Sequence, residues 1–343
     1  MKKAFKVFLV LSIVLMALGL CLCVGALATV GFDLAKFSMN AGELSEFDAD
    51  IEGNGISDLV LDNVSEKECA YRVTLVPSPD GDFHVAYGAY NEKDLRWEVE
   101  NGTIRFYSAQ KDWRDYINII SFGVDAIPLT IEVPASVKNI ICDVDAADLA
   151  CEDLSLEGDF YCNSDAAIVK LQDVNVAGSL SLDSDAADIR LERIKTGSLN
   201  VDCDFGKVEM TDLAVGNIVI DADTCDIDLT SIFSEGVFDL SADYGMITME
   251  IVSALTVQVE TDSCDVDFAS LSAEEKIIFK VSYGDINGTI DDAQSAYTIF
   301  MRGDSDDSNI LSGGNGPKVL DVTMDSGDVD IQFLKTNALV EAM

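Results

Sequence analysis

Aspartate recurs at a regular spacing in the carboxyl-terminal two thirds of the chain, and these carboxylates are the side chains best suited to chemistry. The first column occupies one position in a repeat of about twenty residues: Asp145, Asp165, Asp185, Asp204, Asp223, Asp243 and Asp262. A second column follows three residues later: Asp148, Asp188, Asp226, Asp265, Asp285 and Asp328. Carboxylate oxygens are ligands that Ca²⁺ prefers. If the repeats stack in register, carboxylates of neighbouring copies could bridge a calcium ion.

The hypothetical calcium ladder comprises Asp145, Asp165, Asp185, Asp188, Asp204, Asp223, Asp226, Asp262 and Asp265. Two carboxylates one strand spacing apart repel each other by roughly 0.9 kcal/mol in water. Either a bound cation or hydrogen bonds from backbone amides of the bend would relieve this repulsion. We favour the amides, because the sequence holds neither an EF-hand loop nor the glycine-rich nonapeptide of calcium β-rolls. We therefore expect no cofactor, and low-affinity Ca²⁺ binding remains a hypothesis.

A catalytic site is harder to find in this sequence. His84 is the only histidine, and it alternates with apolar neighbours as a surface residue of a strand does. No nucleophile-elbow sequence accompanies it. Acidic pairs such as Asp185 and Asp188 could serve a carbohydrate-active enzyme, but similar pairs occur in nearly every repeat, whereas a catalytic site should be a local exception. The sequence therefore predicts a protein that is not an enzyme.

Cysteine is the remaining reactive residue type. Cys142, Cys151 and Cys162 fall at inward positions of the repeat, and Cys225 and Cys264 at a position that otherwise holds Gly or Ala. Buried free thiols behave as small apolar side chains, which is the interpretation we favour. Stacked Cys142 and Cys162 could approach disulfide distance in an oxidising compartment. Zinc is not expected, because the sequence has no Cys-x-x-Cys pair.

Each repeat predicts two short strands joined by a bend. Apolar residues alternate with polar ones before the Asp corner, as at Leu180 and Leu182, and again after it, as at Ile189 and Leu191. Strict period-two alternation is typical of strands with one buried face. Equivalent strands of successive repeats would pair in parallel and form apolar ladders. The predicted fold is an all-β, parallel β-solenoid of about ten coils of roughly 20 residues. The copy at 302–315 fits poorly and indicates an irregular rung or an inserted loop.

The segment before the repeats is also rich in strand signals. Alternation predicts strands at 71–76, 83–87, 95–99, 103–107 and 129–133. Repeat arrays need an atypical end that shields the first core layer, and this segment is placed to be that cap. We therefore divide the chain into a membrane anchor or uncleaved signal at 1–32, a β-rich cap at 33–139, the solenoid at 140–334 and a tail at 335–343.

The amino terminus predicts a transmembrane helix. Lys2, Lys3 and Lys6 precede an apolar stretch at 7–30, which is longer than the roughly 20 residues that a membrane-spanning helix needs. Basic residues stay on the cytoplasmic side, so the amino terminus is expected in the cytoplasm and the bulk of the chain outside the cell membrane. The alternative is a cleaved signal peptide, for which Ala26-Leu27-Ala28 offers a peptidase site.

Charge excludes one class of partner. The formal net charge is -40, with only 22 Lys and Arg residues. Nucleic-acid surfaces need a basic footprint, so nucleic acid is not expected to bind. The expected partners are the membrane, through the amino-terminal helix, and a surface polymer or an envelope protein.

The order of these features resembles a known family. A hydrophobic amino terminus, an irregular β region ending at Leu129-Thr-Ile-Glu-Val-Pro134, and units such as Asp325-Ser-Gly-Asp-Val-Asp-Ile331 resemble the bacterial β-strand-repeat proteins called domain of unknown function 4097, or putative adhesin. The resemblance implies a surface-exposed, membrane-linked protein tied to adhesion or envelope stress, and it offers no catalytic residues. We therefore predict an adhesion or envelope-interaction module. The alternatives are a regulatory or scaffold protein that acts through a membrane partner and, more remotely, a carbohydrate-active β-helix enzyme.

Overall fold

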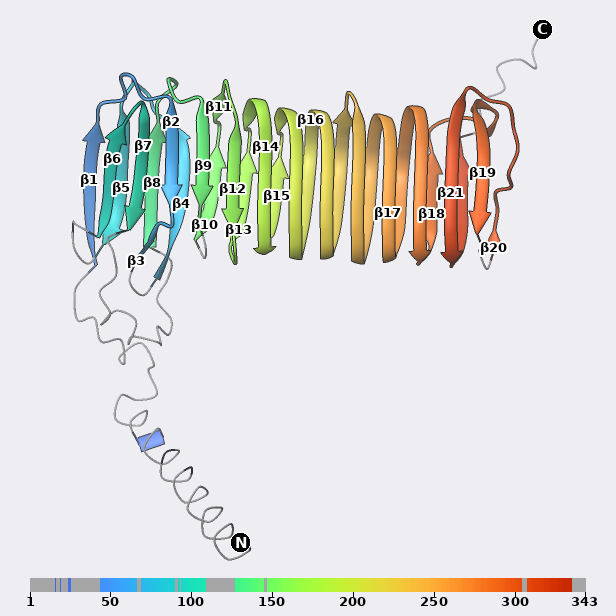
Figure 1. The fold of residues 1–343 in the computed structure, drawn as a ribbon, viewed down its shortest axis with the longest axis horizontal. Helices are drawn as coiled ribbons and strands as arrows, with labels where there is room; N and C mark the ends of the chain where they lie inside the picture. Colours follow the sequence, from blue (N-terminus) through green and yellow to red (C-terminus); the bar gives the residue numbers. More distant parts are fainter. Residues whose placement is uncertain are drawn as a thin grey trace, which may run out of the picture.

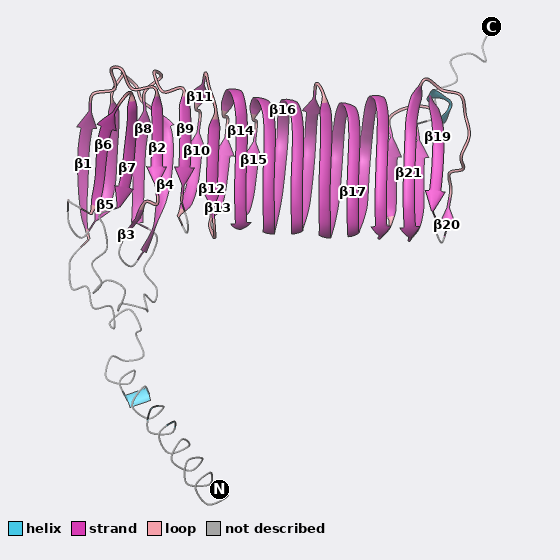
Figure 2. Cartoon of the chain, viewed as in Figure 1, coloured by secondary structure: helices cyan, strands magenta, loops and turns pink. Residues whose placement is uncertain are grey.

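Strands make up almost all of the fold in a computed structural model of the chain (Figures 1 and 2). The structure describes residues 44–66, 69–89, 94–108, 127–144, 147–303 and 307–334, together with residues 16, 19, 24, 25 and 92. The one short helix among its named elements is the 3₁₀ turn η3, Gln294–Ala296. The all-β class predicted from the sequence is confirmed.

The strands fall into an amino-terminal group and a long regular stack. The first group consists of β1 Ser45–Ile51, β2 Asp58–Asp62, β3 Ser65–Glu66, β4 Cys69–Pro77, β5 Phe83–Ala89, β6 Leu95–Glu100, β7 Thr103–Ser108 and β8 Ile127–Val133. The stack begins with β9 Asn139–Asp143, β10 Asp148–Glu152, β11 Ser155–Leu156, β12 Phe160–Ser164, β13 Ile168–Gln172, β14 Asn175–Ala186 and β15 Asp188–Glu192. It continues with β16 Lys195–Ser234, β17 Val237–Tyr283, β18 Ile286–Ile290, β19 Tyr297–Gly303, β20 Asp307–Ser308, β21 Lys318–Ser326 and β22 Asp328–Phe333.

Successive repeats pair in parallel at the predicted spacing. Phe160 of β12 lies between Ile140 of β9 and Leu180 of β14, each one repeat away, and Ile218 of β16 pairs with Phe238 of β17. All five of these apolar side chains are buried. The period-two alternation thus places one apolar residue of each strand on the next, which is the ladder arrangement of a parallel β-solenoid.

A second bend in each repeat depends on backbone geometry that the alternation pattern does not reveal. In seven successive repeats one residue at this bend adopts a left-handed conformation, with φ between 54° and 60°, at Asp153, Asp173, Arg193, Asp212, Ser231, Ile251 and Ser270. Asp and Asn tolerate this region better than other residues with a side chain, and β-branched residues tolerate it worst. The column explains why polar residues predominate at this bend, and Ile251 stands out from it.

The chain is out of sequence order at the amino-terminal end of the stack. β2 lies between β7 and β9, and β4 lies between β8 and β10. Outside them, β6 pairs with β7, and β5 pairs with β8 and β1, all in antiparallel fashion. The five strands predicted from the sequence in this region correspond to β4, β5, β6, β7 and β8. Antiparallel strands therefore terminate the parallel ladder at this end.

The carboxyl-terminal end is also out of order. β21 lies between β17 and β19, and β22 lies between β18 and β20; Figure 1 shows β21 on the inner side of β19. β21, which follows β19 in the chain, thus lies between β17 and β19 in the ladder. The irregular copy noticed at 302–315 overlaps this outermost rung, and an end rung has a partner on one face only. Its departure from the repeat pattern follows from that position.

The predicted membrane anchor at 7–30 lies almost wholly outside the described residues. Within the part of the chain that the structure describes, no helix is long and apolar enough to cross a bilayer. The anchor and the orientation derived from it stay predictions. The tail at 335–343 also lies outside the described residues.

Candidate functional site: the acidic corner edge

The Asp corners of successive repeats lie side by side along one edge of the stack. We call this surface the corner edge and define it as residues 165–168, 185–188, 204–207, 223–226, 243–246, 262–265, 282–285 and 325–328. Ser164 pairs with Ser184, and Ala186 with Phe205, so Asp165, Asp185 and Asp204 follow one another in register. The in-register acidic column expected from the sequence is present in the structure.

Carboxylates of the second column bond to backbone amides of the next coil. The Oδ1 atoms of four Asp residues accept hydrogen bonds of 2.8 to 3.1 Å, in the pairs Asp148 with Ile168 N, Asp226 with Met246 N, Asp265 with Asp285 N, and Asp285 with Asp328 N. The sequence favoured amide bonding within the bend itself. The structure instead uses these four carboxylates to join neighbouring coils.

The acidic neighbours also affect ionisation on the strand face beside the corner. Asp202 pairs with Asp183 of the preceding coil. Its pKa is raised, first by partial burial and then by the carboxylates of Asp183 and Asp221. Carboxylates stacked on this strand face therefore repel one another.

The calcium hypothesis gains no support from side-chain geometry. Among the described residues, no group of three or more His, Cys, Asp or Glu side chains is placed to hold a metal ion. Asp145, the first member of the predicted ladder, lies outside the described residues. The second-column members Asp226 and Asp265 use Oδ1 on backbone amides, and Asp188 lies 3.9 Å from the guanidinium of Arg190. The calcium ladder stays a prediction.

An exposed aromatic row runs along the same edge, and the sequence reasoning missed it. Phe205, Tyr244 and Tyr283 follow the corner position directly and are 57%, 54% and 62% exposed. Thr224 and Ser263 occupy the equivalent position in the coils between them. The signal was available as a double repeat, because the numbers 205, 244 and 283 differ by 39. Aromatic residues therefore occupy this position in alternate coils from Phe205 to Tyr283.

Backbone geometry accompanies this alternation. The aromatic coils carry Gly after the aromatic residue, and Gly245 has a φ of 139°. A Cβ atom on Gly245 would lie 2.1 Å from the carbonyl oxygen of Cys225 in the preceding coil, so only glycine fits. The intervening coils carry Cys225 and Cys264, whose side chains are buried. Between residues 204 and 285, two kinds of corner thus alternate along the edge, an aromatic-glycine corner with an exposed ring and a cysteine corner with a buried thiol.

Comparison with known proteins gives the chain a family. Residues 66–332 match the model of the Toastrack DUF4097 family. The chain belongs to this family. The resemblance seen in the sequence is confirmed, and the match includes the strands from β4 to β21. A search among curated proteins finds no match.

Solved structures similar to this Toastrack chain come from bacteria. One is a putative adhesin from Bacteroides fragilis NCTC 9343, with 11% identity, a TM-score of 0.33 and coverage of 84% of this chain and 97% of that chain. Two come from Parabacteroides distasonis ATCC 8503. A putative lipid binding protein has 11% identity, a TM-score of 0.46 and coverage of 85% and 98%. A putative adhesin has 10% identity, a TM-score of 0.42 and the same coverage.

Six cysteines in the described part of the Toastrack chain lie inside the stack as free thiols. Cys142 and Cys162 are partners in neighbouring strands, and both are buried and unbridged. Burial raises the pKa of Cys162 to about 12, so this thiol stays protonated and unreactive at neutral pH. The Sγ atom of Cys225 lies 3.1 Å from that of Cys203 in the coil before it. Cys203 was not singled out from the sequence, although it continues an inward column.

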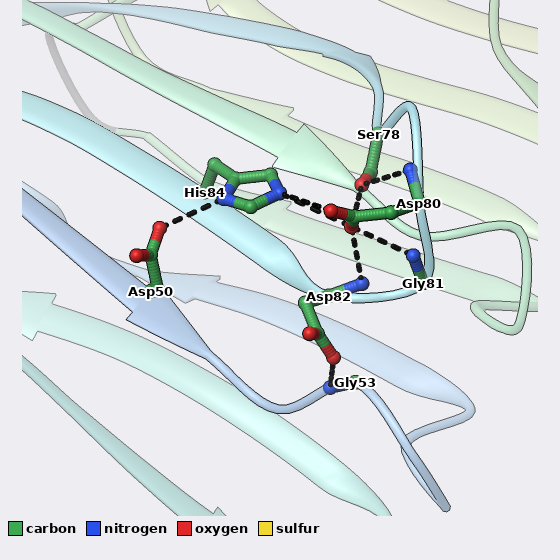
Figure 3. Close-up of polar contacts among 7 residues, drawn as sticks. All are labelled: Asp50, Gly53, Ser78, Asp80, Gly81, Asp82 and His84. Carbon is green, nitrogen blue, oxygen red and sulfur yellow. Dashed lines mark hydrogen bonds and ion pairs between the residues drawn. The ribbon is translucent and has the colours of Figure 1, made fainter.

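His84 is held between two carboxylates in the amino-terminal cap (Figure 3). Its Nδ1 lies 2.8 Å from Asp50 Oδ1 on β1, and its Nε2 lies 3.1 Å from Asp80 Oδ1 in the turn after β4. Asp80 Oδ1 also accepts hydrogen bonds from the backbone N–H groups of Gly81 and Asp82. The hydrogen bond to Asp50, followed by that to Asp80, raises the pKa of His84.

This arrangement argues against His84 as a general base. A general base needs a free ring nitrogen within reach of a substrate proton, and both nitrogens of His84 face carboxylates. Ser78 bonds to Asp80 rather than to the imidazole, so these residues do not form the Ser-His-Asp relay of a hydrolase. The geometry fits a structural tie between β1, β5 and the turn.

Proposed function

We propose that this Toastrack protein is a non-enzymatic, membrane-anchored extracytoplasmic module for adhesion or cell-envelope interaction, and that its corner edge is the surface that binds the partner. The proposed topology is a single pass through the cell membrane with the amino terminus in the cytoplasm. We further propose that the stack comprises about ten coils, which would give an elongated body able to present the edge well beyond the membrane.

One observation carries the proposal, the row of exposed aromatic rings on an edge that is rich in aspartate. Large exposed apolar side chains that gather in one place mark interaction sites on soluble surfaces. Phe205, Tyr244 and Tyr283 lie at the same position of their coils, directly after the corner residues Asp204, Asp243 and Ser282. A repeated surface of this kind suits a repeated or extended partner.

The non-enzymatic part of the proposal rests on how the ionisable groups are arranged. The Asp pairs of the corner edge recur from coil to coil, and four second-column carboxylates bond to backbone amides. His84 is occupied by Asp50 and Asp80. Such groups are committed to holding the fold, which leaves little for acid and base catalysis.

Binding to the envelope can be tested with the full-length protein in detergent. We expect it to sediment with purified cell-wall fractions, and we expect the triple variant F205A/Y244A/Y283A to stay in the supernatant. A matched control is Tyr161→Ala, which removes an exposed aromatic residue from a strand outside the corner edge. Equal sedimentation of the triple variant and the control would exclude the corner edge as the binding surface.

The anchor requires a separate test in cells. We expect the full chain to remain in the membrane pellet after a carbonate wash and to be cut by protease added outside the cells. Removal of residues 7–30 should abolish membrane retention. Crosslinking to a membrane protein without any binding to wall fractions would instead favour the regulatory or scaffold alternative.

A further inference from the structure

The aromatic positions of the corner edge form one continuous row across five coils. Thr224 pairs with Tyr244. The thiol of Cys225 contacts the backbone oxygen of Cys203, which ties the Phe205 coil to the Thr224 coil. The thiol of Cys264 contacts the backbone oxygen of Ala242, which ties the next pair of coils. Gly284 lies against the carbonyl of Cys264. The order along the edge is therefore Phe205, Thr224, Tyr244, Ser263 and Tyr283.

The spacing of this row is set by the β ladder. Neighbouring parallel strands lie about 4.8 Å apart, so aromatic side chains on alternate coils repeat at about 9.6 Å. This repeat is close to the length of one disaccharide unit in an extended β-1,4-linked glycan. In such a glycan every second sugar presents the same face, and the C–H groups of a pyranose face stack on aromatic rings. Small side chains at Thr224 and Ser263 leave room for the sugars between the stacked ones.

Charge selects among such glycans. Between residues 204 and 285 the corner edge carries seven aspartates, Asp204, Asp223, Asp226, Asp243, Asp262, Asp265 and Asp285. The one basic residue of these bends, Lys207, is paired with Glu209 and Asp228. An anionic polymer would be repelled by this edge, and a cationic one attracted. Amino groups on the sugars would supply the positive charge at a regular spacing.

We propose that the corner edge binds a linear β-1,4-linked glycan whose sugars carry free amino groups. Alternate sugars stack on Phe205, Tyr244 and Tyr283, and their ammonium groups pair with the flanking aspartates. This inference rests on the proposed role of the corner edge in envelope interaction and names the chemical class of the partner.

The experiment uses the full-length protein in detergent and a β-1,4-linked hexamer of glucosamine as the probe. Calorimetric titration should detect binding to the wild-type chain, and F205A/Y244A/Y283A should weaken it at least about tenfold, as expected for the loss of aromatic stacking contacts. Tyr161→Ala should bind as the wild type does. An unchanged melting temperature of the triple variant would show that folding is intact. If it falls, the single variant Tyr244→Ala, with a smaller loss of affinity, replaces it.

Two further probes separate charge from shape. The fully N-acetylated hexamer should bind more weakly than the glucosamine hexamer, because it lacks the ammonium groups. Hexalysine has the charge without the sugar faces, and the triple variant should bind it as the wild type does. The inference is overturned if hexalysine matches the glucosamine hexamer, or if the triple variant keeps full affinity for the hexamer. Binding to wall fractions without binding to the hexamer would overturn this inference and leave the proposed function in place.

Discussion

Single residues decide how well each coil closes at its bends. The left-handed column shows this most clearly, because Asp, Arg, Ser and Ile all adopt nearly the same backbone conformation there. The stacking of neighbouring coils imposes that conformation whatever the side chain prefers. Local strain at one position is therefore balanced by the ladder hydrogen bonds around it.

Ile251→Asn is expected to stabilise the protein. Ile251 has a φ of 59° and is 52% exposed, so the substitution loses little burial and removes a β-branched residue from the left-handed region. We expect a gain of about 1 kcal/mol and a rise of about 2 °C in melting temperature. Asp212→Asn, at the same column position, should change stability little. A fall in melting temperature for Ile251→Asn would contradict this account.

His84 predicts a pH-dependent contribution to stability. Its pKa in the folded state is raised above 6.5, so the stabilisation it provides is complete below that value and is lost as pH rises through the folded pKa. Its partner Asp80 has a lowered pKa, so the pair persists until the pH falls below the ordinary range of Asp.

The measurement compares thermal melts of the wild type and His84→Gln at about pH 5.5 and about pH 9. We expect the wild type to exceed the variant by a larger margin in melting temperature at the lower pH. An equal margin at both values would contradict this account, because it would show that folding does not raise the pKa of His84.

Several coils of the stack belong to one continuous strand, because the chain bends at each corner without losing its ladder pairing. β16 and β17 are 40 and 47 residues long and pass through several bends without leaving the ladder. This continuity arises because corner residues such as Ala222 and Thr224 keep their partners in the next coil. At both ends, in contrast, the order of the strands in the ladder departs from their order in the sequence. β2 lies between β7 and β9, and β21 lies between β17 and β19.

The order at the carboxyl-terminal end predicts a reversal in hydrogen exchange. β21 has ladder partners on both sides, β17 and β19, whereas β19 has β21 on one side and an isolated bridge to Gly313. Amides of 318–326 should therefore exchange more slowly than those of 297–303, because edge strands open more readily. Faster exchange in 318–326 would mean that the chain instead stacks in sequence order.

The stacked coils form an elongated, acidic body (Figure 1), and repulsion among its negative charges lowers the stability of the folded state. The full chain has a net charge of -40, and each in-register carboxylate of the stacked coils adds repulsion that increases with the length of the stack. Hydrogen bonds from the next coil's amides offset part of this repulsion locally. Dissolved ions screen the rest, because surface charges interact over only about 10 Å at 0.1 M salt.

The charge of the whole molecule predicts that salt stabilises it. The melting temperature of the full-length protein should rise when NaCl is increased from about 10 mM to about 300 mM, because screening weakens the repulsion.

Binding of calcium to the aspartates is tested in the same series. At equal ionic strength, millimolar CaCl₂ should raise the melting temperature no more than NaCl if the aspartates serve the bends, and a larger rise would establish the calcium ladder.

The sequence alone determined the all-β class, the parallel stacking of the repeats and the acidic column, because period-two alternation and a fixed repeat length are local properties of the chain. The tertiary structure alone decided which group accepts each hydrogen bond. Asp226, for example, bonds to Met246 one coil away. The tertiary structure also decided that β2 lies between β7 and β9 and that β21 lies between β17 and β19. Local alternation cannot predict these positions, because they depend on contacts between segments that are not consecutive in the chain. Only the coordinates show that the side chains of Phe205, Tyr244 and Tyr283 are exposed on one edge, because the sequence pattern does not report solvent exposure.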